Sequence, residues 1–486
     1  MSSTINVLFL AAEAEPFVKI GGLADVAGSL PAALRRLSPR SMNGARLDVR
    51  LALPLHRAIR ADGLVLRPAA EFELQRAGTP YPVQVLQTES NGVPVYLVSG
   101  GPITQSGAVY LPDLAADRDK FAFFSLAALE MLAHLDWMPQ IVHANDWHTS
   151  LALHALRSRN QRLLPRQART VLTVHNLPFM GSDGADVLQA YGLEALDEPR
   201  LPPWAGTQPL PLGLVAADRI VAVSPTYGRE IRTPAFGCGL EPYLVGRGTD
   251  VSGILNGLDT TSFDPKTDPT LPAHFSAASL APRAVSKAAL QQELGLPQDP
   301  GRPLLAMIGR IDRQKGVDIA LEVLPRIAGE DWQFVILGCG DPALERDALR
   351  LEADFPDRVR AAVRYDSPLS RRIYAGADLF LMPSRYEPCG LAQMIAMRYG
   401  CVPLVSATGG LMDTVEAGRT GFVFEPASSV DFRATLLAAL TAFRSKPSWQ
   451  KLQANGMRRD FSWKRPAERY AQLYLDLMGM ERRSQT

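Results

Sequence analysis

The sequence contains few cysteines, no excess of either charge and no long apolar run. Its four cysteines lie far apart and form no CxxC pair, which argues against a disulfide scaffold or a structural zinc site. Lys and Arg total 51 against 50 for Asp and Glu, a net charge of +1, so the basic surface of a nucleic-acid-binding protein is not expected. No stretch approaches the roughly 20 apolar residues of a membrane helix, and the first residues lack the basic region of a signal peptide. We therefore expect a cytoplasmic protein with no nucleic-acid, membrane or metal partner.

What the sequence does contain is a repeated alternation of short apolar runs and amphipathic stretches. Its 486 residues, of which 47% are hydrophobic, suggest about two or three domains. The alternation starts with an expected strand at 7–10 and helix at 23–37, and starts again with an expected strand at 304–308 and helix at 317–327. Strands that alternate with helices indicate βαβ units and a mainly parallel sheet. The predicted fold class is therefore α/β, with two doubly wound domains joined near residues 250–260.

Ligands of such sheets bind beyond the carboxyl ends of the strands, so the residues directly after each expected strand are the candidate site. The first such segment is KIGGLADV, residues 19–26, which follows the first strand and opens a helix. Gly21 and Gly22 let backbone N–H groups approach an anion at the helix N-terminus, and Lys19 adds a positive charge for phosphate. An ordinary glycine-containing turn between a strand and a helix explains the pattern equally well.

The second segment is GRIDRQKG, residues 309–316, after the first strand of the second half. Arg310 and Lys315 lie on either side of a turn, so both can converge on one anion. A pyrophosphate leaving group needs such neutralisation. The alternative is a solvated basic turn, and the position directly after a strand favours the functional interpretation.

The third segment is PSRYEPCGL, residues 383–391, again between an expected strand and a helix. Glu387 stands at the helix start, where the helix dipole favours its negative charge. A simple helix-start carboxylate is the common alternative, but such a density of turn and polar residues is unusual. Cys389 has no histidine near it in the sequence, so we interpret it as a small packing residue.

The fourth candidate combines two polar stretches, HANDWH and TVHN. The spacing of His143, Asp146 and His148 matches no zinc pattern, so a metal site is not favoured. Carboxylate, amide and imidazole groups beside a tryptophan suit a sugar better. We predict site roles for Asp146 and His175, and core packing for His143.

The fifth segment, residues 406–415, follows another expected strand and contains two adjacent glycines. The backbone amides of Thr408, Gly409, Gly410 and Leu411 can form a second anion nest.

Together and in this order, these segments resemble the bacterial and plant glycogen and starch synthases of glycosyltransferase family 5. The resemblance covers nearly the whole chain and rests on the motifs KxGGLADV, HxxDWH, TVHN, VSPTYxxEI, ILNGLD, GRxxxQKG, SRxEPCGLxQ and TGGLxDTV. It implies the GT-B architecture, in which two Rossmann-like domains face a central cleft. The implied parts are an acceptor-side domain (1–255), a donor-side domain for the nucleotide sugar (256–460) and a C-terminal helix (461–486) that crosses back to the first domain.

The resemblance also implies an activity: retaining transfer of α-D-glucose from ADP-glucose to the non-reducing 4-hydroxyl of an α-1,4-glucan such as glycogen, with release of ADP. No cofactor and no metal are implied, because cationic side chains neutralise the leaving diphosphate. The residues that the match assigns to donor phosphate, glucose or base are Lys19, Gly21, Gly22, Asn256, Tyr365, Thr408, Gly409, Gly410 and Leu411. Those assigned to the reaction itself are Glu387, Lys315, Arg310, Asp146 and His175.

Within that assignment, Arg310 and Lys315 grip the diphosphate, and Glu387 holds the sugar and balances positive charge at the anomeric carbon. Asp146 and His175 meet the transferred sugar. These groups come from both expected domains, so closure of the cleft is expected to be part of catalysis.

The chain departs from related patterns at three places. Ile395 stands where many other retaining GT-B enzymes carry a second glutamate after Glu387, so no protein nucleophile is apparent. A front-face mechanism, in which the leaving phosphate takes the acceptor proton, is therefore expected. Segments 99–112 and 178–214 lack the residues expected there, so the acceptor contacts are not predicted.

Two other functions stay open. The first is another retaining GT-B glucosyltransferase that uses a different acceptor or UDP-glucose as donor. The second is a non-catalytic glucan-binding relative, against which the presence of Lys19, Arg310, Lys315 and Glu387 argues.

Overall fold

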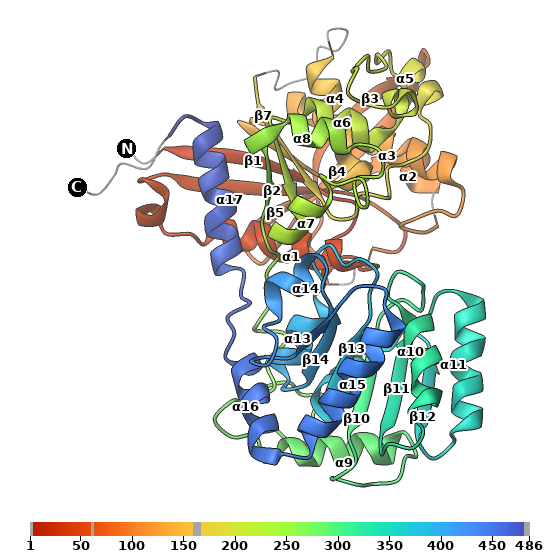
Figure 1. The fold of residues 1–486 in the computed structure, drawn as a ribbon. Coiled ribbons are helices and arrows are strands. Elements are labelled where there is room, and N and C mark those ends of the chain that lie inside the picture. The colour runs from red at the N-terminus through yellow and green to blue at the C-terminus, as the bar shows by residue number, and fades with distance from the viewer. Residues whose placement is uncertain (1–2, 60–62, 106, 159–166, 481–486) are drawn as a thin grey trace. The chain divides into compact units, whose positions relative to one another are not determined.

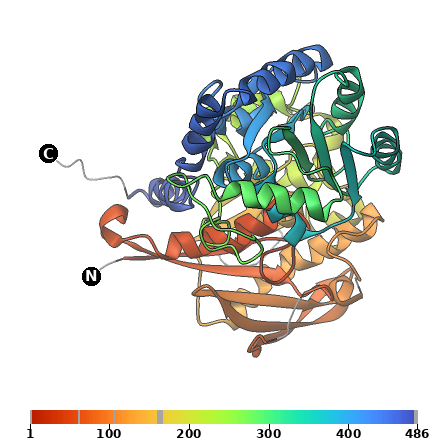
Figure 2. The same ribbon diagram turned by 90° about the horizontal axis from the view of Figure 1, so that it is seen from below.

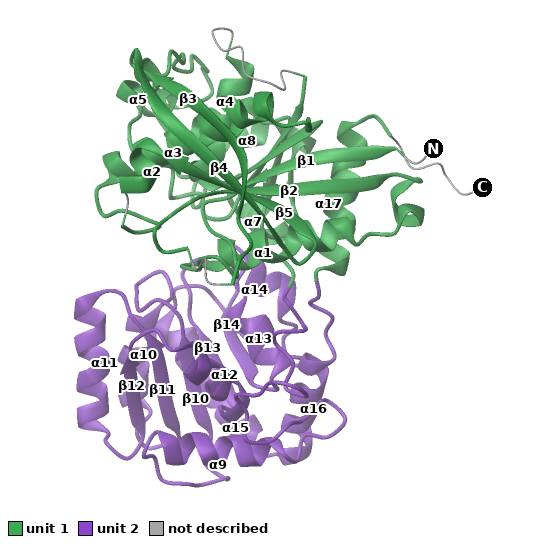
Figure 3. Ribbon diagram, turned by 180° about the vertical axis from the view of Figure 1, so that it is seen from behind, with its two compact units in different colours: residues 1–257, 463–486 green, residues 258–462 purple. Residues whose placement is uncertain are grey.

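The protein forms two compact units, coloured separately in Figure 3. The computed structural model describes residues 3–59, 63–105, 107–158 and 167–480. Unit 1 comprises Met1–Gly257 and Trp463–Thr486, and unit 2 comprises Leu258–Ser462.

Each unit boundary lies two residues after its predicted position. The sequence places them after residues 255 and 460, and the structure after Gly257 and Ser462. The chain therefore returns to unit 1 with its last segment. Of the expected C-terminal segment, residues 481–486 lie outside the described residues.

A nine-stranded sheet forms the centre of unit 1, in the order β3-β4-β5-β2-β1-β6-β7-β8-β9. Neighbouring strands are parallel, except that β4 is antiparallel to both β3 and β5. The strands are β1 (Thr4–Leu10), β2 (Arg46–Pro54), β3 (Arg67–Arg76), β4 (Thr79–Ser90), β5 (Val93–Gly100), β6 (Ile141–Asn145), β7 (Arg169–Val174), β8 (Arg219–Ala222) and β9 (Val251–Gly253). The order of the parallel strands reverses between β1 and β6, which is the topological switch point beyond which ligands bind in such sheets.

Helices and short 3-10 turns connect the strands of unit 1. The α-helices are α1 (Gly22–Arg35), α2 (Gly101–Gln105), α3 (Leu114–Glu130), α4 (Asp146–Arg157), α5 (Ala185–Ala190), α6 (Pro209–Ala216), α7 (Pro225–Glu230), α8 (Glu241–Gly246) and α17 (Lys464–Leu477). The 3-10 turns are Pro39–Met42, Met131–His134, Pro203–Thr207 and Gly248–Asp250. Helix α3 starts where the Asp113 side chain accepts the N–H groups of Ala115 and Ala116, an ordinary N-cap.

The sheet of unit 2 has six parallel strands in the order β12-β11-β10-β13-β14-β15. The strands are β10 (Leu304–Ile308), β11 (Gln333–Gly338), β12 (Val359–Val363), β13 (Leu379–Met382), β14 (Val402–Ser406) and β15 (Phe422–Phe424). This is the strand order of the dinucleotide-binding Rossmann fold, and its switch point lies between β10 and β13.

Helices cover both faces of this second sheet (Figure 1 and Figure 2). Strands covered on both faces are expected to be continuous apolar runs, as in LLAMI of β10 and LFLM of β13. The helices are α9 (Arg283–Glu293), α10 (Val317–Arg326), α11 (Pro342–Asp354), α12 (Ser367–Gly376), α13 (Ala392–Arg398), α14 (Gly409–Thr414), α15 (Ser429–Phe443) and α16 (Lys446–Met457). The prediction of two α/β domains with mainly parallel sheets is confirmed.

The C-terminal helix α17 packs against α1 and the sheet of unit 1 (Figure 1). Its Tyr474 hydroxyl lies 2.6 Å from Nδ1 of His143 on β6, and the other ring nitrogen lies 2.7 Å from Oγ1 of Thr173 on β7. Burial lowers the pKa of His143 to about 3, so the ring is neutral. The predicted packing role of His143 is confirmed, and its hydrogen bonds hold α17 on the sheet.

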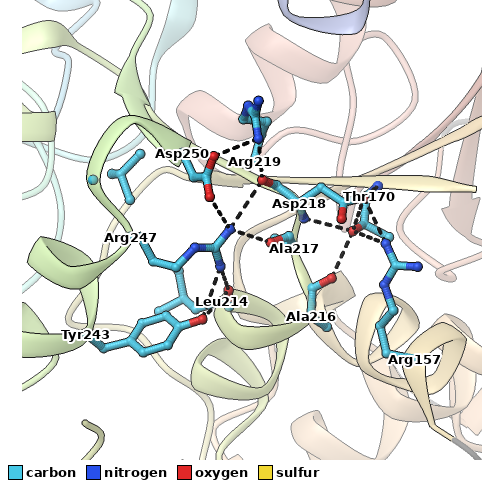
Figure 4. A network of polar contacts seen from close by, with 12 residues as sticks. Arg157, Thr170, Leu214, Ala216, Ala217, Asp218, Arg219, Tyr243, Arg247 and Asp250 are labelled. Carbon is cyan, nitrogen blue, oxygen red and sulfur yellow. Dashed lines mark hydrogen bonds and ion pairs between the residues drawn. The ribbon is translucent and has the colours of Figure 1, made fainter. Parts of the chain in front are cut away.

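Charged side chains close the amino ends of β7, β8 and β9 (Figure 4). Asp218 Oδ2 accepts hydrogen bonds from Thr170 N and from Arg157 Nη2, each at 2.8 Å. Arg247 donates to the carbonyl oxygens of Leu214 and Ala217. These contacts satisfy backbone groups at the amino edge of the sheet. This is the edge opposite the carboxyl edge, where ligands of such sheets bind.

Across the described ranges, no helix combines the length and the apolar character needed to cross a membrane.

Candidate active site

Asp146 lies at the carboxyl edge of unit 1, where β6 ends and α4 begins. Its backbone has a left-handed φ of 54°, a conformation that costs free energy in a non-glycine residue and is often found at functional sites. Oδ1 accepts hydrogen bonds from the backbone N–H groups of His175 (2.7 Å) and Asn176 (3.3 Å). Burial raises the pKa of Asp146 to about 7. Near neutral pH this carboxyl is therefore present in both its protonated and its ionised form.

His175 follows β7 and joins Asp146 in one cluster. Asn145 Nδ2 donates to the Leu10 carbonyl oxygen, which turns its Oδ1 toward His175 Nε2, 2.9 Å away. Nε2 therefore carries the proton, and Nδ1 remains as an acceptor. Burial lowers the pKa of His175 to about 3, so the ring is neutral. The pair offers a neutral imidazole and a buried carboxyl, which suit sugar hydroxyls.

The 19–22 turn follows β1 at the same edge of the sheet. The N–H groups of Ile20 and Gly21 both donate to the carboxylate of Glu13, with Gly21 N at 3.1 Å from each oxygen. The helix start was expected to receive a ligand anion, but the amide of Gly21 already faces the protein's own carboxylate.

Lys19 and Gly22 flank that contact. Helix α1 begins at Gly22, and Asp25 in its first turn forms an ion pair with Lys19 Nζ at 2.6 Å. The cation expected to meet donor phosphate therefore has a carboxylate partner before any ligand arrives.

Glu13 was not a candidate from the sequence. It is 1% exposed, and the Tyr110 hydroxyl donates to its Oε1 at 3.0 Å. Burial raises the pKa of Glu13. The signal that could have found it is its position just after β1, the same rule that led to Lys19.

The 309–316 turn of unit 2 is organised by Asp312. Its Oδ1 accepts the backbone N–H of Lys315 at 2.9 Å, and its Oδ2 forms an ion pair with Arg310 Nη1 at 2.7 Å. Arg310 Nη2 also donates to Gln314 Oε1 at 2.7 Å. The guanidinium is thus oriented by two neighbours on its own turn, at the carboxyl end of β10.

Glu387 lies beyond β13, on the other side of the switch point, and contacts Lys315. Lys315 Nζ is 2.6 Å from Glu387 Oε2, and Ser384 Oγ donates to the same oxygen at 3.2 Å. Glu387 is 5% exposed, so these two contacts compensate the burial of its carboxylate. The structure therefore brings into contact two residues that are 72 positions apart in the sequence.

Three of the four amides in the predicted anion nest at 408–411 donate within the chain. Thr408 N donates to the carbonyl oxygen of Ser406 (3.0 Å), Gly410 N to that of Glu387 (3.0 Å) and Leu411 N to that of Thr408 (3.1 Å). The nest interpretation therefore relies on N–H groups that already have acceptors.

The two glycines of this turn have a different physical reason. A Cβ on Gly409 would lie 1.9 Å from the carbonyl oxygen of Glu387, and one on Gly410 would lie 2.0 Å from that of Cys389. Only glycine lets the backbone approach so closely. The backbone of the 408–411 turn thus packs directly against the backbone of the loop that contains Glu387.

Tyr365 and Asn256 each follow a further strand, one in each unit. Tyr365 follows β12 and is 76% exposed, so its ring is open for stacking. Asn256 follows β9 in unit 1 and is buried, and its Oδ1 has no hydrogen-bond partner within the described part of the chain.

Comparison with known proteins agrees with this geometry. A family model described as the starch synthase catalytic domain matches residues 6–246, and one described as glycosyl transferases group 1 matches residues 290–452. Glycogen synthase 2 of Geobacter sulfurreducens is 39% identical over 484 residues, which cover 97% of this chain and 98% of the relative. Glycogen synthase of Anaeromyxobacter sp. is 40% identical over 97% of this chain and 99% of its own. The chain belongs to the glycogen and starch synthase family of glycosyltransferases.

A solved structure of the family shows the same fold over nearly the full chain. The catalytic domain of starch synthase IV from Arabidopsis thaliana, bound to ADP and acarbose, superposes with a TM-score of 0.88 at 32% identity, covering 98% of this chain and 100% of that one. The predicted family, GT-B fold and glycosyltransferase class are thus confirmed, and glycogen synthase function follows from the full-length matches.

The matched regions contain nearly all candidate residues. Lys19, Asp146 and His175 lie in the starch synthase match, and the Arg310, Lys315 and Glu387 turns in the second match. Asn256 lies outside both regions.

Proposed function

We propose that this family member transfers α-D-glucose from ADP-glucose to the non-reducing 4-hydroxyl of an α-1,4-glucan, with retention of configuration and release of ADP. The observation that carries the proposal is the contact of Lys315 with Glu387 at the switch point of unit 2, next to Arg310. The choice of ADP is supported by the starch synthase IV structure, which binds ADP and acarbose.

Lys315 and Arg310 supply the positive charge that the leaving diphosphate needs. As the bond from the anomeric carbon to the phosphate oxygen breaks, negative charge grows on ADP, and preorganised cations stabilise it without reorganising solvent. Asp312 holds both residues of the turn in place before substrate arrives. The buried Glu387 carboxylate sits beside Lys315 and balances the positive charge that develops on the sugar.

Asp146 and His175 recognise the transferred glucose. His175 Nδ1 accepts a hydrogen bond from a sugar hydroxyl, because Nε2 is already committed to Asn145. Asp146 keeps Oδ2 for a second hydroxyl while Oδ1 holds two backbone N–H groups.

Retention proceeds without a protein nucleophile in this proposal. Ile395 stands after Glu387 where other retaining enzymes carry a carboxylate, and it is buried in α13. The bond from the anomeric carbon to phosphate breaks, the bond to the acceptor oxygen forms on the same face, and the acceptor proton passes to the leaving ADP oxygen. Isolation of a glucosyl–enzyme adduct would refute this route.

The reaction is proposed to need no cofactor and no metal, since Arg310 and Lys315 provide the charge. Full activity in a chelating buffer is the expected result. A cytoplasmic location is proposed because all four cysteines are free thiols, as is usual in a reducing compartment.

The test compares kcat/KM for ADP-glucose and UDP-glucose with glycogen as acceptor, using labelled glucose and digestion of the product by an α-1,4-specific enzyme. ADP-glucose is expected to be preferred. Arg310→Ala should lower kcat/KM about 10- to 150-fold, whereas Arg326→Ala, which removes an exposed cation on α10, should not. Binding of glucan without turnover of either donor would instead identify a non-catalytic relative.

A further inference from the structure

Tyr110 lies just before α3, and the Glu13 carboxylate connects its hydroxyl to the 19–22 turn. Its hydroxyl donates to Glu13 Oε1 at 3.0 Å, and the same carboxylate accepts the N–H groups of Ile20 and Gly21. Burial raises the pKa of Tyr110 well above its usual value, so the hydroxyl stays a donor. One tyrosine therefore completes the set of donors around Glu13.

The backbone on both sides of Tyr110 is held by an ion pair. Lys120 Nζ contacts Asp117 Oδ1 at 2.6 Å and donates to the carbonyl oxygen of Val109 at 2.7 Å. Asp117 Oδ1 also accepts the N–H of Leu111 at 3.0 Å. Lys120 is 0% exposed and Asp117 3%, so two charges are buried on α3 to fix the residues before and after Tyr110.

Burying an ion pair seldom adds net stability, because desolvation of the charges offsets their attraction. A pair of this kind is better explained by what it positions. Here both partners hold backbone atoms of one short segment, and that segment presents a single hydroxyl to Glu13. The contacts thus form a continuous chain from α3 through Tyr110 and Glu13 to Gly21.

We propose that Lys120, Asp117, Tyr110 and Glu13 form a positioning chain, here called the Tyr110 clamp, that fixes the 19–22 turn and through it places Lys19 for the donor. None of the four touches substrate in this proposal. Tyr110 lies in segment 99–112, where the sequence lacks the residues expected from the family, whereas Asp117 and Lys120 lie on α3 and Glu13 follows β1. This inference depends on the proposed function for its kinetic readout only.

The test uses Tyr110→Phe, which removes one hydroxyl and keeps the ring. The matched control is Tyr96→Phe, since Tyr96 is also buried and its hydroxyl accepts a hydrogen bond from Arg50 on β2 at 2.7 Å. Tyr110→Phe should lower kcat/KM for the sugar nucleotide about tenfold, with KM for glucan unchanged. Tyr96→Phe should alter neither. Equal kinetics of the two variants would overturn the clamp.

A double-mutant cycle tests whether the clamp acts through Lys19. In a Lys19→Ala background, Tyr110→Phe should cost little further activity, because the group that it positions is gone. Fully additive losses would show that Tyr110 acts elsewhere. Glu13→Gln, which keeps an acceptor oxygen for Gly21, should retain more activity than Glu13→Ala. Equal loss in the two would contradict a positioning role.

A readout without substrate separates this inference from the proposed function. Amide hydrogen exchange of residues 17–24 should be faster in Tyr110→Phe than in Tyr96→Phe. If the wild-type protein has no glucosyltransferase activity but this difference appears, the proposed function fails and the clamp stands. If the activity is present and exchange is equal in both variants, the clamp fails alone.

Discussion

The contact between Lys315 and Glu387 leads to a prediction that separates stability from catalysis. Replacing Lys315 by alanine leaves the Glu387 carboxylate, which is 5% exposed, with Ser384 Oγ at 3.2 Å as its remaining partner at Oε2. A buried charge that loses its partner costs several kcal/mol, but the serine donor and the partial exposure of Lys315 reduce this. We expect a loss of about 2 kcal/mol, which for a unit of this size lowers the melting temperature by roughly 4–8 °C.

The double variant Lys315→Ala/Glu387→Gln removes the stranded charge together with its partner. The amide oxygen still accepts from Ser384, so most of the lost stability should return. Activity should not return, because the cation proposed to stabilise the leaving diphosphate is still absent. Both variants should fall about 100-fold or more in kcat/KM for the donor.

Calorimetry on the intact chain and steady-state kinetics measure the two effects separately. Arg326→Ala is the control, since its ion pair with Glu322 on α10 is largely exposed and such pairs contribute little. The reasoning is refuted if Lys315→Ala melts like wild type, or if the double variant recovers activity along with stability.

Three further predictions follow from single contacts. Tyr474→Phe should lower the free energy of unfolding by about 1–3 kcal/mol, because Nδ1 of buried His143 loses its partner; urea titration measures this, and an unchanged midpoint would contradict it. For Asp146, the folded-state pKa of about 7 lies above the ordinary value of 3.8, so between these two pH values the folded chain holds a proton that the unfolded chain has lost. Wild-type stability should therefore fall relative to Asp146→Asn as the pH rises toward 7, and parallel stability curves would refute the shift. Gly410→Ala should disrupt the site, because its Cβ would lie 2.0 Å from a carbonyl oxygen, whereas Gly329→Ala, which has open space, should keep activity; equal activity of the two would rule this out.

The strand-end rule explains why much of the candidate site could be predicted from sequence. Lys19, Asp146, Arg310 and Glu387 each lie in the segment that follows a parallel strand, and parallel strands bring such segments to one edge of a sheet. Local periodicity was enough to find those runs. It was not enough to find that Lys315 and Glu387 touch, because that contact depends on strand order.

The Tyr110 clamp shows what local patterns cannot indicate. Tyr110 and Glu13 are 97 residues apart, and Asp117 and Lys120 sit inside a helix, where they look like ordinary solvated charges. Their burial comes from packing of α3 against the sheet, which no short motif records. Their burial is visible only in the structure.

Glycine was the most ambiguous signal. The pairs at 21–22 and 409–410 both suggested backbone amides open to an anion. In the structure Gly21 faces Glu13, and Gly410 donates to the carbonyl oxygen of Glu387. Glycine permits both a bare amide and a close backbone approach, and the sequence does not distinguish the two.

The near-zero net charge has a counterpart at the site itself. Each cation proposed to meet the donor already contacts a carboxylate: Lys19 with Asp25, Arg310 with Asp312, and Lys315 with Glu387. An arriving diphosphate therefore exchanges partners rather than meeting bare charges, so its affinity reflects the difference between two sets of contacts. Such an exchange favours the state in which the phosphate carries the most charge. In the proposed reaction that state is approached as ADP leaves, and stabilising it more than the bound substrate would accelerate the reaction.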